Sequence, residues 1–272
     1  MGKTKVLSRK KSQICLLLFI LANTLQAQVH PLINAHSHND YKQKKPLSDA
    51  LNNGFLSLEA DIFLIRNELI VSHFYPILKK KHTLESLYLK PLNDSITKHR
   101  GSIYENNDST LILLIELKSE ASSTYKELEK LLYKYKNILS SYENGEITKR
   151  AITIIITGNK PFKELENENL RFAFIDKNLL ALTNTTSNLL CPLASAKYST
   201  ILNWKGKGII STNEKQKLIE IVTKAHTQNI KVRLWASPEN ENVWKLLLEC
   251  GVDLINTNEL EKLKLFLIKS GK

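Results

Sequence analysis

Short apolar runs alternate with amphipathic segments along residues 28–272. Eight of these runs are rich in Val, Ile and Leu and are continuous, without regular polar positions between the apolar ones. Continuous runs are typical of parallel strands that are buried on both faces of a sheet. The predicted strands span residues 32–35, 55–65, 111–117, 151–157, 171–175, 193–197, 231–235 and 252–255.

The segments between the strands show helical periodicity. In residues 125–139 the apolar positions fall on one helical face, with Lys and Glu on the other, and residues 218–225 repeat this pattern. Ser211 and Glu214 precede the second segment at the spacing of a capping box. Further helices are predicted at residues 243–251 and 260–268.

Strands that alternate with helices over about 250 residues predict an α/β fold, a single (β/α)8 TIM barrel. A doubly wound parallel sheet is the alternative, but no glycine-rich phosphate-binding loop follows the first strand. No repeat, linker or change in composition divides residues 28–272, so we expect one domain.

The first 27 residues have the pattern of a secretory signal peptide. Residues 1–13 carry five basic residues and no acidic one, and the apolar run 14–22 is followed by small and polar residues up to Ala27. This run is shorter than the roughly 20 residues that span a bilayer. We therefore predict cleavage after Ala27 and a secreted or periplasmic mature chain, with an uncleaved anchor as the alternative.

Composition and charge narrow the class of protein. A hydrophobic content of 42% and a charged content of 24% exclude a collagen-like or wholly disordered chain. The formal net charge is +12, but residues 28–272 hold 34 basic and 27 acidic residues, or +7. The densest basic run, residues 79–81, has no stacking or base-reading residues within it, so we expect no nucleic-acid partner. Nothing in the pattern implies an obligate protein partner.

The predicted mature chain holds two cysteines, Cys191 and Cys250. Export permits a disulfide, but a chain of this size buries a large core without one. Cys250 falls in a predicted helix and has the properties of a small apolar residue. We predict that the two cysteines do not pair.

Three carboxylates are predicted to meet at the mouth of the barrel, where the active sites of TIM barrels lie. Glu59 and Asp61 are two residues apart in the second strand, so both side chains point to the same face. Glu116 stands near the end of the third strand. Converging carboxylates repel each other unless a cation lies between them, and oxygen ligands suit Ca²⁺ and Mg²⁺.

Histidines are expected at the same mouth. His36 and His38 end the first strand, and His73 ends a short additional strand predicted at residues 68–73. Imidazoles titrate near neutral pH and can act as general acids and bases beside a metal. A single histidine at a strand end is often a hydrogen-bonded structural residue. Histidines that occur together with buried carboxylates are harder to explain by structural needs alone.

These residues resemble the motifs of the glycerophosphodiester phosphodiesterase and phosphatidylinositol-specific phospholipase C superfamily. The motifs are His36, Glu59-Ala-Asp61, Val71-Ser-His73 and Ile115-Glu116-Leu-Lys118. Residues 35–41 (AHSHNDY), 58–61 (LEAD) and 83–92 (TLESLYLKPL) are more similar still to the branch named after an altered-inheritance-of-mitochondria protein. The resemblance extends over essentially the whole mature chain and is most specific in its first 90 residues.

The resemblance implies a TIM-barrel phosphoric diester hydrolase that acts on a glycerophosphodiester or a phospholipid headgroup with one Ca²⁺ or Mg²⁺. It implies a metal held by Glu59, Asp61 and Glu116, with His36 and His73 as the acid/base pair. Lys118 would contact the phosphate. Beyond the family pattern, His38 and Asn39 are candidates for further phosphate contacts, with metal binding or support of the loop as the alternatives for His38. Trp235, Tyr198 and Trp204 are candidates for the wall on the substrate side. Which histidine is the acid stays open, as does attack by water or, through a cyclic phosphodiester, by a substrate hydroxyl.

Two positions depart from the superfamily pattern. Phe74 follows the second histidine where many relatives have Asp, which leaves the orientation of His73 without its usual partner. Ser37 follows the first histidine where glycerophosphodiesterases have Arg, so that one phosphate contact must come from elsewhere.

Other functions fit parts of the sequence. His36 and His38 also resemble the metal motif of amidohydrolases, but that class needs further histidines after the fifth and sixth strands and an Asp after the eighth, and this sequence has none at those ends. A non-catalytic exported barrel that binds a phosphorylated ligand is a second alternative. Residues 75–78, beside the basic run 79–81, are a candidate for transient contact with a membrane surface, with an ordinary surface loop as the simpler interpretation.

Overall fold

The computed structural model describes residues 29–76, 82–105 and 107–272. Within it, Pro31–Lys272 form one compact unit, which is described below. The predicted signal peptide, residues 1–27, lies outside the described residues and stays a prediction. The same holds for the basic run 79–81 and for the last two residues of the candidate membrane loop, 77 and 78.

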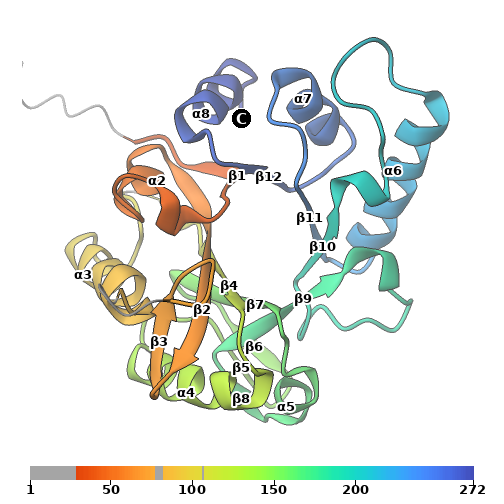
Figure 1. Ribbon diagram of the computed structural model, residues 1–272. Helices are drawn as coiled ribbons and strands as arrows, with labels where there is room; N and C mark the ends of the chain where they lie inside the picture. Colours follow the sequence, from red (N-terminus) through yellow and green to blue (C-terminus); the bar gives the residue numbers. More distant parts are fainter. Residues whose placement is uncertain (1–28, 77–81, 106) are drawn as a thin grey trace, which may run out of the picture. The chain divides into compact units, whose positions relative to one another are not determined.

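In the described part of the chain, eight parallel strands close into a barrel in the order β1-β12-β11-β10-β9-β7-β4-β2, and pairing of β1 with β2 completes the ring (Figure 1). The predicted TIM barrel is therefore confirmed. The eight strands are β1 (Leu32–Ser37), β2 (Phe55–Ile65), β4 (Leu111–Leu117), β7 (Ile152–Gly158), β9 (Ala173–Asn178), β10 (Leu193–Lys197), β11 (Lys231–Trp235) and β12 (Leu254–Thr257).

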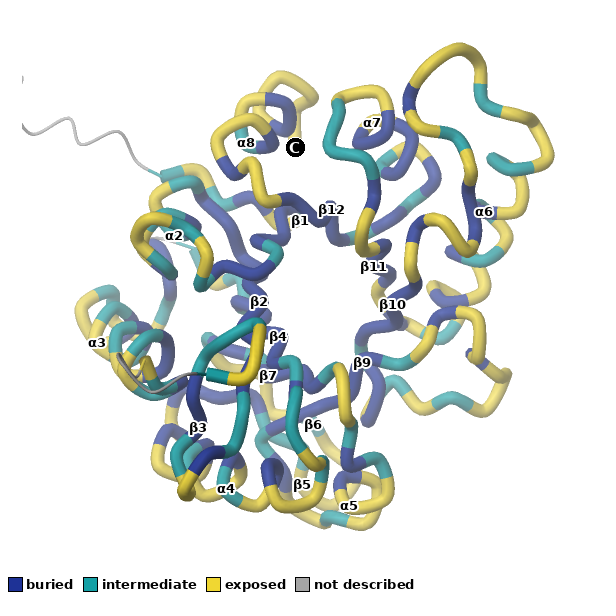
Figure 2. Tube along the Cα trace, in the orientation of Figure 1, coloured by how far each residue is buried: buried dark blue, intermediate teal, exposed yellow. Residues whose placement is uncertain are grey.

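Helices surround the barrel, with their exposed faces outward and the strands buried inside (Figures 1 and 2). The α-helices are α2 (Ser48–Asn52), α3 (Lys90–Lys98), α4 (Ala121–Lys134), α5 (Phe162–Asn167), α6 (Thr212–His226), α7 (Glu241–Glu249) and α8 (Leu260–Lys269). Single turns of other helix types lie at η1 (Asp40–Lys42), η2 (Glu85–Leu89), η3 (Leu179–Ala181) and η4 (Tyr198–Thr200). A small separate sheet contains β5 (Ser141–Glu143), β6 (Glu146–Thr148) and β8 (Leu170–Arg171).

Two details of the helices differ from the expectation. The predicted helix of residues 125–139 ends early, because Tyr135 leaves helical geometry and Leu139 then forms a bridge to Ile152. The predicted capping box at Ser211 is wrong: its side chain makes no capping hydrogen bond. Glu214 instead accepts a hydrogen bond from the backbone N–H of Asn203 (2.6 Å) and so holds the loop that precedes α6.

The barrel interior is layered. An apolar cluster at its base contains Ile112, Leu114, Ile155, Phe174, Leu193 and Leu254. Side chains two residues apart in a strand share a face, so the next inward position toward the mouth is occupied by Glu116, Thr157, Asp176, Ser195 and Asn256. Five strands thus contribute apolar side chains to this cluster, two of them from β4, and one polar side chain each to the layer above it, which is where chemistry can occur.

A hairpin returns the chain to this polar layer. β3 (Glu68–Val71) pairs antiparallel with the end of β2, and the turn residues Arg66 (φ 51°) and Asn67 (φ 63°) are both left-handed, as a tight hairpin turn requires. After β3, the backbone N–H of Ser72 donates to the carbonyl of Asp61 (3.0 Å). The next residue, His73, is thereby placed beside the Asp61 side chain.

Cys191 and Cys250 are both buried and free, as predicted. Among the described helices, none has the length and apolar character needed to cross a membrane.

Candidate active site

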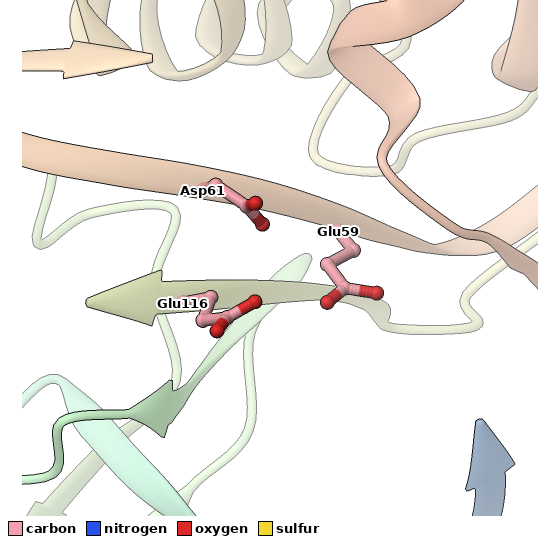
Figure 3. Close-up of side chains that lie close together, drawn as sticks. All are labelled: Glu59, Asp61 and Glu116. Carbon is pink, nitrogen blue, oxygen red and sulfur yellow. The ribbon is translucent and has the colours of Figure 1, made fainter. Parts of the chain in front are cut away.

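The three predicted carboxylates converge at the barrel mouth. Glu59 and Asp61 come from β2, and Glu116 of β4 lies directly opposite Asp61 in the strand register. One carboxylate oxygen of each residue lies within 4.8 Å of the other two (Figure 3). Glu59 and Asp61 are buried and Glu116 is half-buried. We refer to these three residues as the acidic triad.

The acidic triad fits a divalent cation. Asp61 Oδ1 is buried and has no hydrogen-bond partner among the described residues, which is costly for a carboxylate oxygen. Burial raises the pKa of Glu116, and the negative charges of Asp61 and Glu59 raise it further. A bound cation would relieve both effects, and a set of carboxylate oxygens is what Ca²⁺ and Mg²⁺ prefer.

Lys118 lies against the triad. Its Nζ is 2.8 Å from Glu116 Oε1 and 3.1 Å from Asp61 Oδ2. Burial would lower the pKa of Lys118, but the two carboxylates outweigh this effect and raise it. The ammonium group therefore stays charged at the mouth of the barrel, within reach of any anion that binds at the triad.

His36 is enclosed on both sides of its ring. Its Nδ1 lies 2.7 Å from Ser57 Oγ, and its Nε2 lies 2.8 Å from Arg233 Nη1. Burial lowers the pKa of His36 to about 4, so the ring is neutral at pH 7. Because an arginine can only donate, Nε2 accepts from Arg233, and the proton lies on Nδ1 and points to Ser57.

His73 has a different environment. Its Nδ1 lies 2.9 Å from Asp61 Oδ2 and 3.2 Å from the Tyr41 hydroxyl, so Nδ1–H donates to the carboxylate. Its Nε2 has no partner among the described residues, and the side chain is 35% exposed. Phe74 packs edge-on against the ring at 4.7 Å between centroids. Asp61 thus orients His73, a role for which many relatives have an aspartate at the position that Phe74 occupies here.

Tyr41 was not predicted as a site residue. Its hydroxyl lies 2.7 Å from both Asp61 Oδ2 and Asn39 Oδ1. Asn39 adopts a left-handed conformation (φ 48°), which turns the chain after β1 back over the mouth. The only sequence signal for Tyr41 is its place in the motif of residues 35–41.

Asp40 anchors this loop from below. Its buried carboxylate accepts hydrogen bonds from the Leu47 backbone N–H (2.6 Å), the Ser37 hydroxyl (2.8 Å) and the Tyr88 hydroxyl (2.9 Å). The Ser37 hydroxyl is therefore used to hold the loop and is not available to a ligand at the mouth.

The remaining predicted residues lie around the rim. His38 Nδ1 is 3.1 Å from Asn258 Oδ1. Trp235 ends β11 and is 39% exposed, with Lys197 Nζ 5.7 Å from its ring centroid. Tyr198 is buried, and its hydroxyl donates to the carbonyl of Trp204, so it supports the loop that contains Trp204.

Arg233 is the main residue that sequence reasoning missed. Its guanidinium lies inside the barrel, and Nη1 is 2.9 Å from Glu59 Oε2. Burial alone would raise the pKa of Glu59, but the positive charge of Arg233 outweighs this effect and holds the pKa well below its usual range. The available signal was a charged residue between two buried apolar residues of β11, Val232 and Leu234.

Comparisons with known proteins assign the chain to a family. Residues 23–176 match the model of the AIM6-like phosphodiesterase domain, and residues 231–261 match the glycerophosphoryl diester phosphodiesterase family. Altered inheritance of mitochondria protein 6 from Eremothecium gossypii is 29% identical over 277 residues, which cover 89% of this chain and 71% of that protein. The protein of the same name from Saccharomyces cerevisiae is 30% identical over 300 residues, which cover 95% of this chain and 76% of that protein.

A solved structure supports the fold. The crystal structure of a glycerophosphodiester phosphodiesterase from Parabacteroides distasonis superposes with a TM-score of 0.58, over 88% of this chain and 98% of that chain. At 16% sequence identity this likeness concerns the fold alone. Since the first family model covers more than half of the chain, the chain belongs to the family of AIM6-like phosphodiesterase domains, within the PLC-like phosphodiesterase superfamily.

Proposed function

We propose that this protein is a metal-dependent phosphoric diester hydrolase that acts on a glycerophosphodiester or a phospholipid headgroup. One observation carries the proposal: a buried, unpartnered carboxylate oxygen of Asp61 lies in an acidic triad, beside two histidines, at the mouth of a phosphodiesterase-type barrel. Glu59, Asp61 and Glu116 would hold the cation. When bound, the cation would offset negative charge on the phosphoryl group.

The chain's own residues supply the remaining chemistry. Lys118, charged and adjacent to the triad, would bind phosphoryl oxygens as their charge grows. The Nε2 of His73 has no hydrogen-bond partner among the described residues, while Nδ1–H donates to Asp61, so Nε2 can exchange a proton with the reacting oxygen. The Nε2 of His36 faces Arg233 and reaches a substrate oxygen only after that hydrogen bond is exchanged.

The test is turnover of bis(4-nitrophenyl) phosphate and of glycerophosphocholine by the purified protein, with and without EDTA. We expect turnover that EDTA abolishes and that added Ca²⁺ or Mg²⁺ restores. Phosphorus NMR of the products would separate attack by water from attack by a substrate hydroxyl, because only the latter gives a cyclic phosphodiester. Turnover that EDTA leaves unchanged would refute metal dependence. Binding of phosphate esters without any turnover would favour the non-catalytic alternative.

Gly158 offers a test of the triad through the backbone. It ends β7 with φ +72°, and a Cβ there would lie 2.7 Å from both Glu116 Cγ and the Leu117 carbonyl. We expect Gly158→Ala to displace Glu116 and to weaken cation binding at least about tenfold, a typical effect of disturbing the support of a ligand. Because alanine is strained in a left-handed conformation, the substitution should also lower the free energy of unfolding by about 1–2 kcal/mol. Calorimetric titration with Ca²⁺ or Mg²⁺ and denaturant unfolding measure the two effects.

Gly208 provides the matched control. It has a similar φ of +66°, but a Cβ there would meet nothing within 4 Å. Gly208→Ala should therefore show the loss of stability without the loss of cation affinity. Equal cation affinity in both variants would contradict the placement of Glu116 in the site.

A further inference from the structure

Arg233 is held by residues of four different strands. Its Nε lies 3.2 Å from Ser195 Oγ on β10, and its Nη1 lies 2.9 Å from Glu59 Oε2 on β2. The same Nη1 is 3.3 Å from Asn256 Oδ1 on β12 and 2.8 Å from His36 Nε2 on β1. The side chain is 4% exposed, so these contacts fix the plane of the guanidinium inside the barrel.

One nitrogen of this group is left over. Nη2 makes no hydrogen bond with any described residue, although it carries two N–H donors. It is not among the fully buried polar atoms without a partner, so solvent reaches it. The protein contacts therefore account for Nε and Nη1 but leave Nη2 available to a ligand.

The position of Arg233 favours an anionic ligand. Because Nη1 contacts Glu59, the guanidinium borders the acidic triad on the Glu59 side, and Lys118 borders it on the side of Asp61 and Glu116. An anion that binds at the triad would therefore lie between two fixed cations. A guanidinium matches the geometry of phosphate oxygens better than an ammonium does.

Stability alone does not account for a buried arginine here. An ion pair taken out of water gains little net stability, since desolvation offsets the attraction between the two charges. A buried charge that keeps one donor free is instead what a preorganised binding site requires, because the group needs no rearrangement when the ligand arrives.

We propose that Arg233 is a substrate-contacting residue whose Nη2 donates to a non-bridging oxygen of the phosphodiester, while Nε and Nη1 hold it in place. This inference rests on the proposed function, since it assumes a phosphodiester at the triad. Arg233 on β11 would thus make the phosphate contact for which glycerophosphodiesterases have an arginine at the position of Ser37. Ser37 itself donates its hydroxyl to Asp40.

The experiment measures the affinity of inorganic phosphate by calorimetry at saturating Mg²⁺, for the wild type and for Arg233→Lys. The variant keeps the charge but loses the fork of donors. We expect phosphate affinity to fall about 10- to 100-fold, as for loss of a hydrogen bond to a charged group, while Mg²⁺ affinity stays within about twofold. Arg171→Lys is the matched control, because Arg171 is equally buried but packs on the Tyr142 ring outside the mouth.

Several outcomes would overturn the inference. Unchanged phosphate affinity in Arg233→Lys would do so, as would a parallel loss of Mg²⁺ affinity, which would mean that Arg233 acts only through Glu59. If Arg233→Lys does not fold, Ser195→Ala decides, because it loosens the anchor but keeps the guanidinium: weaker phosphate binding supports the inference and unchanged binding refutes it. Because binding is measured without turnover, an inactive wild type that binds phosphate through Arg233 would refute only the proposed function.

Discussion

Replacement of Asp61 by Asn is expected to lower phosphodiester turnover by about 10³-fold or more and to remove cation binding. A bound metal is worth several kcal/mol of transition-state stabilisation, and each 1.36 kcal/mol is a factor of ten in rate. Asp61 is the most connected residue of the triad: Oδ2 contacts Lys118, His73 and Tyr41, and Oδ1 is the buried oxygen without a partner. An amide at this position loses the charge and turns an N–H toward groups that need an acceptor.

Calorimetric titration with Ca²⁺ and Mg²⁺, run on the same preparation as the turnover assay, measures both effects of Asp61→Asn. Asp253→Asn is the control for cation binding, because Asp253 also pairs with a histidine, His226 at 2.8 Å, but is not part of the triad. It should leave the cation affinity unchanged. If Asp61→Asn bound the cation like the wild type, the triad would not be the metal site.

Hydrophobic pattern alone was sufficient for most of the fold. The bounds of β2, β4, β10 and β11 match the predicted runs. β2 and β4 are the clearest cases, because nearly all of their residues are buried. β9 and β12 extend two or three residues beyond the predicted runs, because each ends in inward-facing polar residues, Asp176 in β9 and Asn256 in β12. If polar residues are assumed to lie outside the core, the predicted end of such a strand comes too early.

The same assumption explains why Arg233 was missed. A charged residue between Val232 and Leu234 is interpreted as an exposed group, and only the closed barrel shows that Arg233 faces Glu59 and His36. Its partners come from strands that are distant in sequence, so no local spacing reveals the contact. In contrast, the common face of Glu59 and Asp61 follows from a spacing of two within one strand.

The motif assigns His36 and His73 to one acid/base pair without distinguishing them, but the two side chains have different surroundings. His36 is fully buried with both ring nitrogens engaged, whereas Nε2 of His73 has no partner in the described part of the chain and its side chain is 35% exposed. The position of His73 depends on the β2–β3 hairpin, which brings it back beside Asp61. Burial and partner geometry of this kind are properties of the folded barrel and leave no trace in the spacing of the residues.

This difference leads to separate expectations for the two histidines. His73→Ala should lower kcat by about 10²- to 10⁴-fold, the usual contribution of a general acid or base, because it removes the free Nε2. Cation affinity and the free energy of unfolding should change little, since the side chain is partly exposed and no carboxylate loses its only partner. His36→Ala should instead lower both turnover and stability, because it empties a buried site between Ser57 and Arg233.

Steady-state kinetics, cation titration and denaturant unfolding of the two variants separate these effects. His226→Ala is a close control for His73→Ala: His226 is also partly exposed and also pairs with an aspartate, Asp253, at 2.8 Å, but on α6 and away from the triad. It should retain full kcat. An unchanged kcat in His73→Ala would exclude proton transfer by His73. A fall in kcat that follows a matching fall in cation affinity would show that His73 acts through Asp61, in which case the exchangeable proton must be sought on His36 once its hydrogen bond with Arg233 is released.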